Sequence, residues 1–455
     1  MTISARKKSF NLPRYTGVLL AAPLALLCVG VAAAPVSVEP RLETPALFDD
    51  DAGGNADADD PAIWVHPLQP DKSVVVATKK DAGLSVYNLG GAEIQAIAAP
   101  PAPGPEDAAG RFNNTDLLYG FELGNRKVDL AVVTDRGSDK LRIYVINPRA
   151  AAAGEPPLSD VTDPSAPFLF SSTQSEVNDQ ATGYGLAVYR DNRSGRSFAY
   201  VSQRSRTTIA KIELLDVGGR IGYRKVQALV LPDTFVLPDS STWTPCTDPG
   251  DGPQVEGMVV DQDQGILYAG QEAVGIWKIG LQLDVAKPEL IDKVREYGVP
   301  YTYDSEEEEC IIDFAADPGY GGENLSADVE GLTIYYAVDT PGYLLASSQG
   351  DNTFAVYERR GSNRYIGSFA LTDTDDTDSV QESDGAAVVN VPLGRSFPGG
   401  LLVTQDGDNT PEELDEEGEE RDITNFKFTP WPSVARAFAV PLAVDPLGWN
   451  PRTGY

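Results

Sequence analysis

Acidic residues recur at the start of similar short segments of this chain. Glu256-Gly257 and Glu330-Gly331 each precede an apolar segment, a turn and two further apolar segments. Asp384-Gly385 opens a similar unit, and Asp60-Pro61-Ala62-Ile63-Trp64 opens a variant of it. Calcium takes roughly six to eight oxygen ligands and tolerates irregular geometry, so carboxylates from several segments can share one ion. The pattern therefore favours a calcium site built from residues far apart in the sequence.

The chain offers many further oxygen ligands of the kind that calcium prefers. They are Asp57, Asp59, Asp116, Glu272, Asp328, Asp378, Asp406, Asp408 and Asn409. Carboxylates that cluster without a cation repel one another, and this repulsion raises their pKa values. A bound metal would remove that conflict.

The residues that most hydrolases rely on are missing from the sequence. His66 is the single histidine, and the proline that follows it favours a structural turn. This excludes a phosphohistidine mechanism, a usual Ser-His-Asp triad and a histidine-rich zinc site. The chain also lacks a Cys-x5-Arg loop, a Gly-x-Ser-x-Gly elbow and a phosphate loop that ends in Gly-Lys-Ser/Thr. Covalent catalysis is therefore not expected.

Short strands are the elements that must position these carboxylates. The chain contains 43 Gly, 34 Pro and 19 Tyr, a composition that favours turns and strands over long helices. Strands are expected at 62–66, 84–89, 128–134, 141–146, 186–189, 266–269, 275–279, 332–336, 343–347, 354–358 and 401–404.

The strands group into six units of similar pattern. Five begin at Asp60, Tyr184, Glu256, Glu330 and Asp384, and the sixth is the segment 127–147. Units that recur every roughly 50 to 75 residues favour an all-β fold, a six-bladed β-propeller. The innermost strands of propeller blades run in one direction, so the residues that open the units should converge at one mouth of the central channel.

The two ends of the chain predict export and a single domain. Residues 1–34 combine a basic start with an apolar run and a small-residue end, which is typical of a secretory signal peptide. A membrane anchor is the alternative. We expect a flexible segment over 35–46, one propeller domain over 47–440 and a C-terminal tail over 441–455. The protein would be a secreted monomer, extracellular or periplasmic.

Charge limits the partners of the protein. The chain has 68 acidic and 36 basic residues and a formal net charge of −32. Such a chain repels nucleic acid and anionic membranes, so neither is expected as a partner once the signal peptide is removed. A polyphosphate substrate would be repelled as well, unless metal cations and a local group of Lys and Arg reverse the field at one site.

The segment Asp57-Ala58-Asp59-Asp60-Pro61-Ala62-Ile63-Trp64 resembles the opening signature of the β-propeller phytase family. Further motifs follow in the order of that family: 78–80, 83–87, 256–258, 277–278, 328–336, 346–350 and 404–407. The resemblance extends from roughly Asp57 to Trp431. It implies calcium-dependent hydrolysis of calcium phytate, a small-molecule substrate, at a site that also holds a neighbouring phosphate.

The resemblance also implies roles for individual residues. Phosphate would be contacted by Lys79, Lys80, Arg136, Tyr184 and Arg204. The catalytic calcium ions would be held by Asp59, Asp60, Glu256, Glu272, Asp328, Glu330, Asp378 and Asp384. Structural calcium ions would be held by Asn114, Asp116, Gln349, Asp406 and Asn409. Lys79, Arg136, Tyr184 and Arg204 would act in catalysis with Glu256, which we expect to lie nearest the attacking water as a metal ligand and candidate base.

The chain departs from the family pattern in three places. Arg204 stands where the family commonly has Lys, which keeps the positive charge. Around Ala181-Thr182, the polar residues that help hold phosphate or calcium in family members are missing, which weakens the expectation of a second phosphate subsite. Insertions at 232–253 and 289–323 each carry one cysteine, and we hypothesise that a Cys246–Cys310 disulfide pins them over the site; two free buried thiols are the alternative. The acidic runs 306–309 and 412–420 are expected to be solvated loops.

Two other classes of protein share a calcium-stabilised propeller. One only binds a ligand, since a fold does not determine a function. Loss of Lys79, Arg136 or the metal carboxylates would mark that class, and all of them are present. The other class is a propeller lactonase, which does not need several cations beside its calcium.

Overall fold

The structure is a computed structural model that describes residues 34–49, 56–285, 287–306, 309–338, 340–411, 413–415, 418 and 420–452. Residues 1–33 of the expected signal peptide lie outside the described residues, and so do parts of both acidic runs. Among the residues described, no helix is long and apolar enough to cross a membrane.

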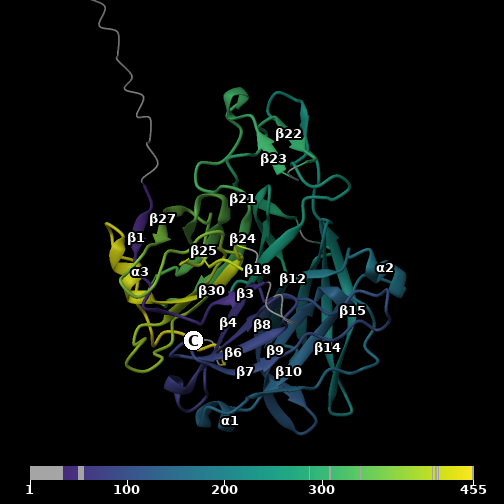
Figure 1. Ribbon diagram of the computed structural model, residues 1–455, viewed down its shortest axis with the longest axis vertical. Helices are drawn as coiled ribbons and strands as arrows, with labels where there is room; N and C mark the ends of the chain where they lie inside the picture. Colours follow the sequence, from purple (N-terminus) through teal and green to yellow (C-terminus); the bar gives the residue numbers. More distant parts are fainter. Residues whose placement is uncertain are drawn as a thin grey trace, which may run out of the picture. The chain divides into compact units, whose positions relative to one another are not determined.

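Six antiparallel sheets of consecutive strands form the blades of a propeller (Figure 1). Blade one consists of β4 (Pro61–Trp64), β5 (Val74–Thr78), β6 (Leu84–Asn88) and β7 (Glu93–Ile97). Blade two consists of β8 (Phe112–Leu123), β9 (Arg126–Asp135), β10 (Lys140–Ile146) and β11 (Leu158–Asp160). Blade three consists of β12 (Gly183–Arg190), β13 (Ser197–Gln203), β14 (Thr208–Val217) and β15 (Arg220–Val230). Blade four consists of β18 (Val255–Asp261), β19 (Ile266–Gln271), β20 (Gly275–Gly280) and β21 (Glu289–Lys293). Blade five consists of β24 (Val329–Tyr335), β25 (Tyr343–Ser348), β26 (Thr353–Glu358) and β27 (Tyr365–Leu371). Blade six contains β28 (Ala386–Val389), β29 (Leu401–Asp406) and β30 (Ile423–Pro430).

The innermost strands of the six blades form a closed ring. Contacts run from β4 through β8, β12, β18, β24 and β28 and return to β4. Apolar side chains pack between neighbouring blades, as where Trp277 of blade four and Tyr336 of blade five share one core cluster. Both faces of a blade are therefore buried, which gives its central strands near-continuous apolar sequences. The expected six-bladed, all-β propeller is confirmed.

The N-terminal segment 35–46 is not the flexible segment that the sequence predicted. β1 (Val36–Val38) pairs in parallel with β27, and β2 (Leu42–Glu43) pairs with β30 as the outer strand of blade six. β3 (Leu47–Phe48) also pairs with β30. The first strands of the chain thus complete the last blades. These strands are only two or three residues long, which is too short for a recognisable periodicity.

The C-terminal segment packs on the propeller after α3 (Trp431–Ala437). The Trp449 ring stacks on Tyr336 with ring centroids 4.0 Å apart. Arg452 pairs with Asp129 of β9, with 2.6 Å between Nη2 and Oδ2. Trp449 and Pro451 line a cavity that reaches Asp60 and therefore lies in the central channel. The chain thus covers one mouth of the channel with its own C-terminal segment.

Blade two begins earlier than the sequence suggested. The segment 127–147 contains its second and third strands, β9 and β10, whereas its innermost strand is β8. β8 carries Asn113, Asn114 and Asp116, whose polar side chains interrupt the apolar alternation on which the strand assignment depended.

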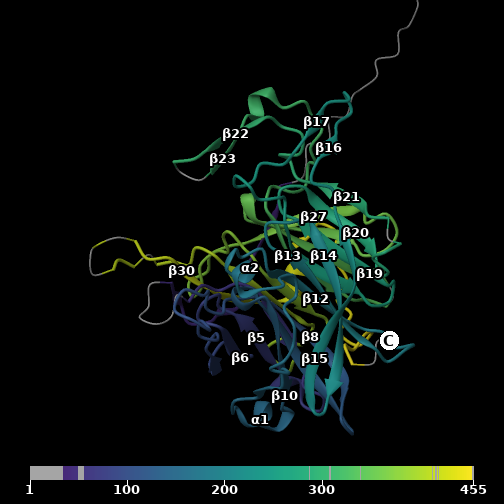
Figure 2. The same cartoon turned by 90° about the vertical axis from the view of Figure 1, so that its right-hand side faces the viewer.

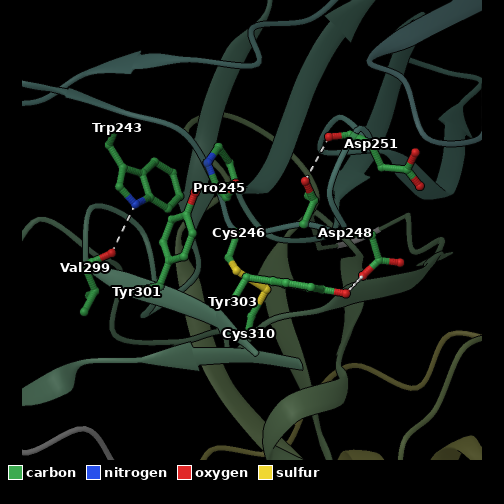
Figure 3. The surroundings of a disulfide bond; sticks show 10 residues. Trp243, Pro245, Cys246, Asp248, Asp251, Val299, Tyr301, Tyr303 and Cys310 are labelled. Atoms are coloured by element: carbon green, nitrogen blue, oxygen red, sulfur yellow. Dashed lines mark hydrogen bonds between the residues drawn. A yellow bond between two sulfur atoms is a disulfide. The ribbon is translucent and has the colours of Figure 1, made fainter. Parts of the chain in front are cut away.

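The two insertions form small hairpins beyond the blades, at the top of Figure 2. β16 (Phe235–Val236) pairs with β17 (Thr242–Trp243), and β22 (Tyr301–Asp304) pairs with β23 (Glu309–Ile312). The second insertion begins after residue 293 and not at 289, because Glu289–Lys293 is the outer strand of blade four. A Cys246–Cys310 disulfide joins the insertions, which confirms the hypothesised pairing (Figure 3).

Candidate metal and phosphate site

The innermost strands of four blades share a β-bulge at their first residues. One extra residue is inserted between Phe112 and Thr115, between Gly183 and Leu186, between Val255 and Met258, and between Val329 and Leu332. The bulges contain Asn113, Tyr184, Glu256 and Glu330. A bulge turns a side chain out of the regular alternation of its strand. The repeated carboxylate-Gly motif therefore marks a β-bulge at the mouth of the channel.

The glycine after each site residue lets neighbouring blades approach closely. A Cβ atom on Gly257 would lie 1.9 Å from the carbonyl oxygen of Glu330, and a Cβ atom on Gly185 would lie 2.0 Å from that of Glu256. Real Cβ atoms are not found that close to backbone oxygens. A larger residue would thus separate the strands that bring the two carboxylates together.

Gly257→Ala should therefore disturb the site as well as the fold. We expect the free energy of unfolding to fall by about 3 kcal/mol, since the clash is with backbone that cannot rotate away. We also expect weaker calcium binding, because Glu330 is pushed outward. Urea denaturation and calorimetric calcium titration measure the two effects. Gly280→Ala is the matched control, because no atom lies within 4 Å of its added Cβ; equal effects of the two variants would contradict the prediction.

A cluster of carboxylates lies where the bulged strands converge. Oxygens of Glu256, Glu272 and Glu330 lie within 4.8 Å of one another. Glu256 is 5% exposed, Glu330 is 4% exposed and the neighbouring Asp59 is 1% exposed. In the described part of the chain, neither oxygen of Asp59 has a hydrogen-bond partner, and the same holds for Glu272 Oε1 and Glu330 Oε2.

The electrostatics of this cluster are unfavourable without a cation. Burial raises the pKa of Asp59 and of Glu330, and the nearby charge of Glu256 raises both further. The pKa of Glu272 is raised by burial and then by Asp328. The pKa of Asp328 is raised to about 6, first by burial and then by Glu296. Buried carboxylates with unpaired oxygens are the ligands that a hard divalent cation needs, so the residues present fit a bound metal ion.

Three cationic side chains face this carboxylate cluster or its surroundings. Lys80 Nζ lies 2.6 Å from Asp57 Oδ2 and 3.1 Å from Asp384 Oδ2. Burial by itself would lower the pKa of Lys80, but the carboxylates of Asp384, Asp59 and Asp57 raise it, so its charge is secure.

The other two cations are guanidinium groups. Arg136 lies over the Tyr184 ring, 5.6 Å from its centroid, and its Nε is buried without a partner among the described residues. Arg204 lines a cavity of about 460 Å³ together with Glu272 and Asp328. The disulfide Cys246–Cys310 lines the same cavity, so the insertions cover this side of the site.

Tyr184 connects to the carboxylate cluster directly. Its hydroxyl donates a hydrogen bond to Glu256 Oε2. Burial and then the charge of Glu256 raise the pKa of Tyr184, so the hydroxyl stays protonated and acts as a donor.

Lys79, which was expected to contact phosphate, lies beside a carboxylate of an outer strand. Its Nζ lies 3.6 Å from Glu93 Oε2, and Glu93 is on β7, the outer strand of blade one. The two neighbouring lysines therefore point to different surroundings, and Lys80 is the one that reaches the carboxylates. Lys80 has a positive φ of 41° at the start of a turn after β5, so its side chain leaves the backbone in a different direction from that of Lys79.

The residues assigned to calcium form three groups. Asp60 lies beside Asn114 and Asp116, and its Oδ2 accepts a hydrogen bond from the Thr115 N–H at 2.9 Å. Asp116 already accepts two backbone N–H groups, from Leu117 and Val188. Gln349 Nε2 donates to Asp384 Oδ1 at 2.8 Å, so Gln349 belongs with the central cluster.

The third group lies around Lys427 of β30, away from the central cluster. Asp378 pairs with Lys427, whose Nζ lies 3.0 Å from Asp406 Oδ2 and 2.7 Å from Asn409 Oδ1. Lys427 is fully buried, and its ammonium supplies positive charge to these oxygens. Asp378 was expected among the catalytic ligands, but the structure groups it with the two residues expected to be structural.

Three residues of the site have contacts that the sequence did not predict. Asp57, named from the sequence only as one of many oxygen ligands, pairs with Lys80. Asn113 donates a hydrogen bond to Glu256, but it lies in β8, an innermost strand whose polar start hid it in the sequence. Glu296 lies in the second insertion and contributes to the raised pKa of Asp328. The acidic motif around Asp57 was the one available signal, since insertions and irregular strands carry no repeat.

The chain is similar to known proteins over most of its length. The sequence model of the family described as Phytase matches residues 8–235 and 286–453. The chain is 32% identical over 419 residues to the 3-phytase of Bacillus subtilis (strain 168), which covers 91% of this chain and 90% of that protein. Among solved structures, virginiamycin B lyase from Staphylococcus aureus is 12% identical, with a TM-score of 0.36 over 85% of this chain and 98% of that one. A protein from Lactobacillus plantarum is 13% identical, with a TM-score of 0.38 over 78% and 89%.

Proposed function

Because this chain belongs to the phytase family, we propose that it hydrolyses the phosphomonoesters of phytate with bound calcium ions. It is a phosphoric monoester hydrolase of the 3-phytase type. The arrangement of the site supports both the phytate substrate and the calcium ions.

One observation carries the proposal: buried carboxylate oxygens without partners lie beside cationic side chains. Asp59, Glu272 and Glu330 supply such oxygens among the described residues. Lys80 and Arg136 supply the positive charge. Carboxylates alone would suit a metal, and basic residues alone would suit an anion. Both together suit a phosphate that binds through cations in a strongly acidic protein.

Each group of side chains has a separate task in the proposed reaction. Asp59, Glu256, Glu272, Glu330 and Asp384 would hold calcium. When bound, calcium would neutralise phosphate charge and lower the pKa of water. Arg136 and Arg204 would bind phosphate oxygens and orient the phosphoryl group for in-line attack. Glu256 would lie nearest the attacking water, with Tyr184 holding its Oε2 in place.

The cavity beneath the insertions would receive the part of the substrate next to the scissile phosphate. Arg204 lines it beside Glu272 and Asp328. Among the described residues, its guanidinium makes no hydrogen bond or ion pair. A neighbouring phosphate of the inositol ring could pair with Arg204. This would replace the polar residues that are missing at Ala181-Thr182.

We further propose that the protein is secreted and monomeric. Residues 1–34 support secretion, because they have the charge, apolar core and small-residue end of a signal peptide. A single chain supplies all six blades and completes the last one with its own N-terminal strand, so a monomer is sufficient.

A direct assay tests the proposed activity. Phosphate release from phytate is measured with calcium, with a chelator, and after calcium is restored, alongside hydrolysis of a lactone. We expect calcium-dependent phosphate release and no lactone hydrolysis. Phosphate release that persists fully in chelator would overturn the role of calcium, and lactone hydrolysis without phosphate release would overturn the substrate class.

A further inference from the structure

Asn113 lies in the bulge that opens β8, and its amide side chain is almost completely buried, at 1% exposed. Its Oδ1 accepts a hydrogen bond from Arg136 Nη1 at 3.0 Å. Its Nδ2 donates to Glu256 Oε1 at 2.6 Å and to Asn114 Oδ1 at 2.8 Å. One amide thus joins a guanidinium of blade two to a carboxylate of blade four.

The chemistry of the two neighbours determines the orientation of this amide. A guanidinium can only donate, so the amide oxygen must face Arg136. An ionised carboxylate can only accept, so the amide nitrogen must face Glu256. No other side chain of this size offers a donor and an acceptor in these positions. Aspartate would place an oxygen against Glu256, and an aliphatic residue would leave both neighbours unpaired.

We propose that Asn113 is a positioning residue that keeps Arg136 and Glu256 apart and aimed at different targets. The inference rests on the proposed function of this site. Arg136 and Glu256 carry opposite charges and contact the two ends of one amide. Without Asn113, Arg136 and Glu256 could pair directly, since a buried guanidinium and carboxylate attract strongly. A direct pair would withdraw the guanidinium from phosphate and the carboxylate from the metal.

Neighbouring contacts are consistent with this arrangement. Glu256 Oε2 accepts from the Tyr184 hydroxyl, so both oxygens of Glu256 are held by neutral donors and their remaining lone pairs stay free for a cation. Arg136 lies over the Tyr184 ring, and its buried Nε has no partner within the described part of the chain. A free donor on Arg136 is what a phosphate oxygen requires.

A double-mutant cycle on phytate hydrolysis tests the inference. We expect Asn113→Ala to lower kcat/KM by about 10- to 100-fold, the usual cost of losing a residue that orients a metal ligand. We expect KM to rise as well as kcat to fall, because phosphate binding by Arg136 is affected. In an Arg136→Ala background the same change should have little further effect. Full, independent effects of the two substitutions would overturn the proposed coupling.

A matched control separates this role from a general loss of packing. Asn390 is also 1% exposed, and its Nδ2 donates to the Asp445 carbonyl oxygen at 3.0 Å, remote from the site. Asn390→Ala should lower the melting temperature and leave kcat/KM per folded molecule unchanged. Equal losses of kcat/KM in both variants would contradict the positioning role.

Calorimetric titration with calcium alone provides a readout that does not depend on turnover. We expect about tenfold weaker calcium binding in Asn113→Ala and native binding in Asn390→Ala. If the wild type binds calcium but releases no phosphate, the proposed function fails while this titration still decides the role of Asn113. Unchanged calcium affinity in Asn113→Ala would overturn the inference even if phytate hydrolysis is confirmed.

Discussion

Glu256→Gln should lower phosphate release from phytate by roughly 1,000-fold while the metal-free protein becomes more stable than the wild type. Both oxygens of Glu256 accept hydrogen bonds, one from Asn113 and one from Tyr184. The glutamine side chain has one acceptor oxygen, so its amide nitrogen must face one of these two donors. The substitution also removes a charge from the expected calcium ligands.

The gain in stability has a separate physical cause. Glu256 raises the pKa values of Asp59, Glu330 and Glu272, because like charges lie close together in a buried cluster. Removing one of these charges relieves the repulsion in the absence of metal. Thermal melts in a chelator measure this effect, and phosphate release with calcium measures the loss of activity.

Glu213→Gln is the matched control for Glu256→Gln. Glu213 is also a buried carboxylate, but it pairs with Arg196 and Arg224, which hold its pKa at about 2. This variant should be less stable than the wild type and equally active per folded molecule. A Glu256→Gln variant with near-native turnover would remove Glu256 from the proposed reaction, and one that is less stable in chelator would contradict the repulsion.

Removal of calcium should abolish activity. It should also make the folded protein less stable as pH rises from acid towards neutral. Burial raises the pKa of Asp328 and that of Asp384 to about 6 each; Glu296 adds to the rise at Asp328, whereas Lys80 opposes the rise at Asp384. Their unfolded pKa values are about 4. A group whose pKa is higher in the folded than in the unfolded protein stabilises the fold at pH values below its unfolded pKa. This stabilisation is lost as pH rises through the folded pKa. The metal-free protein should therefore lose stability between about pH 4 and pH 6.

Calcium should remove this loss, because it binds the ionised carboxylates and only in the folded state. Calcium at about 100 times its dissociation constant adds about 2.7 kcal/mol of stability per site. Melting temperatures measured with chelator and with calcium should therefore diverge as pH rises from about 4 to about 7. A constant difference across this range would show that the raised pKa values do not govern stability. Calcium should also restore phosphate release to chelated enzyme.

Much of the fold was predictable because propeller blades repeat. Glu256-Gly257 and Glu330-Gly331 occupy equivalent places in two units, and the same places in the structure are β-bulges at one mouth of the channel. The repeat failed where strands were short or polar. β2 has two residues, and β8 carries the polar pair Asn113-Asn114 directly after its first residue, so neither showed the periodicity of a strand.

The carboxylates were also predictable, but their partners were not. Residue type and repeat position were enough to bring Glu256 and Glu330 together, since oxygen ligands must converge to hold calcium. The direction of a single side chain is decided by local backbone and neighbours. Lys79 and Lys80 are adjacent in sequence, yet one pairs with Glu93 and the other with Asp57 and Asp384.

The acidic residues that open the blades began as a sequence pattern, and the sequence alone determined that they form a six-bladed propeller with an oxygen-rich mouth. Periodicity and residue type act locally along the chain, so a sequence can reveal them. Only the tertiary structure decided that Asn113 separates Arg136 from Glu256 and that Asp378 belongs with Lys427. These contacts join residues 23 to 143 positions apart, and the packing of the blades sets their geometry.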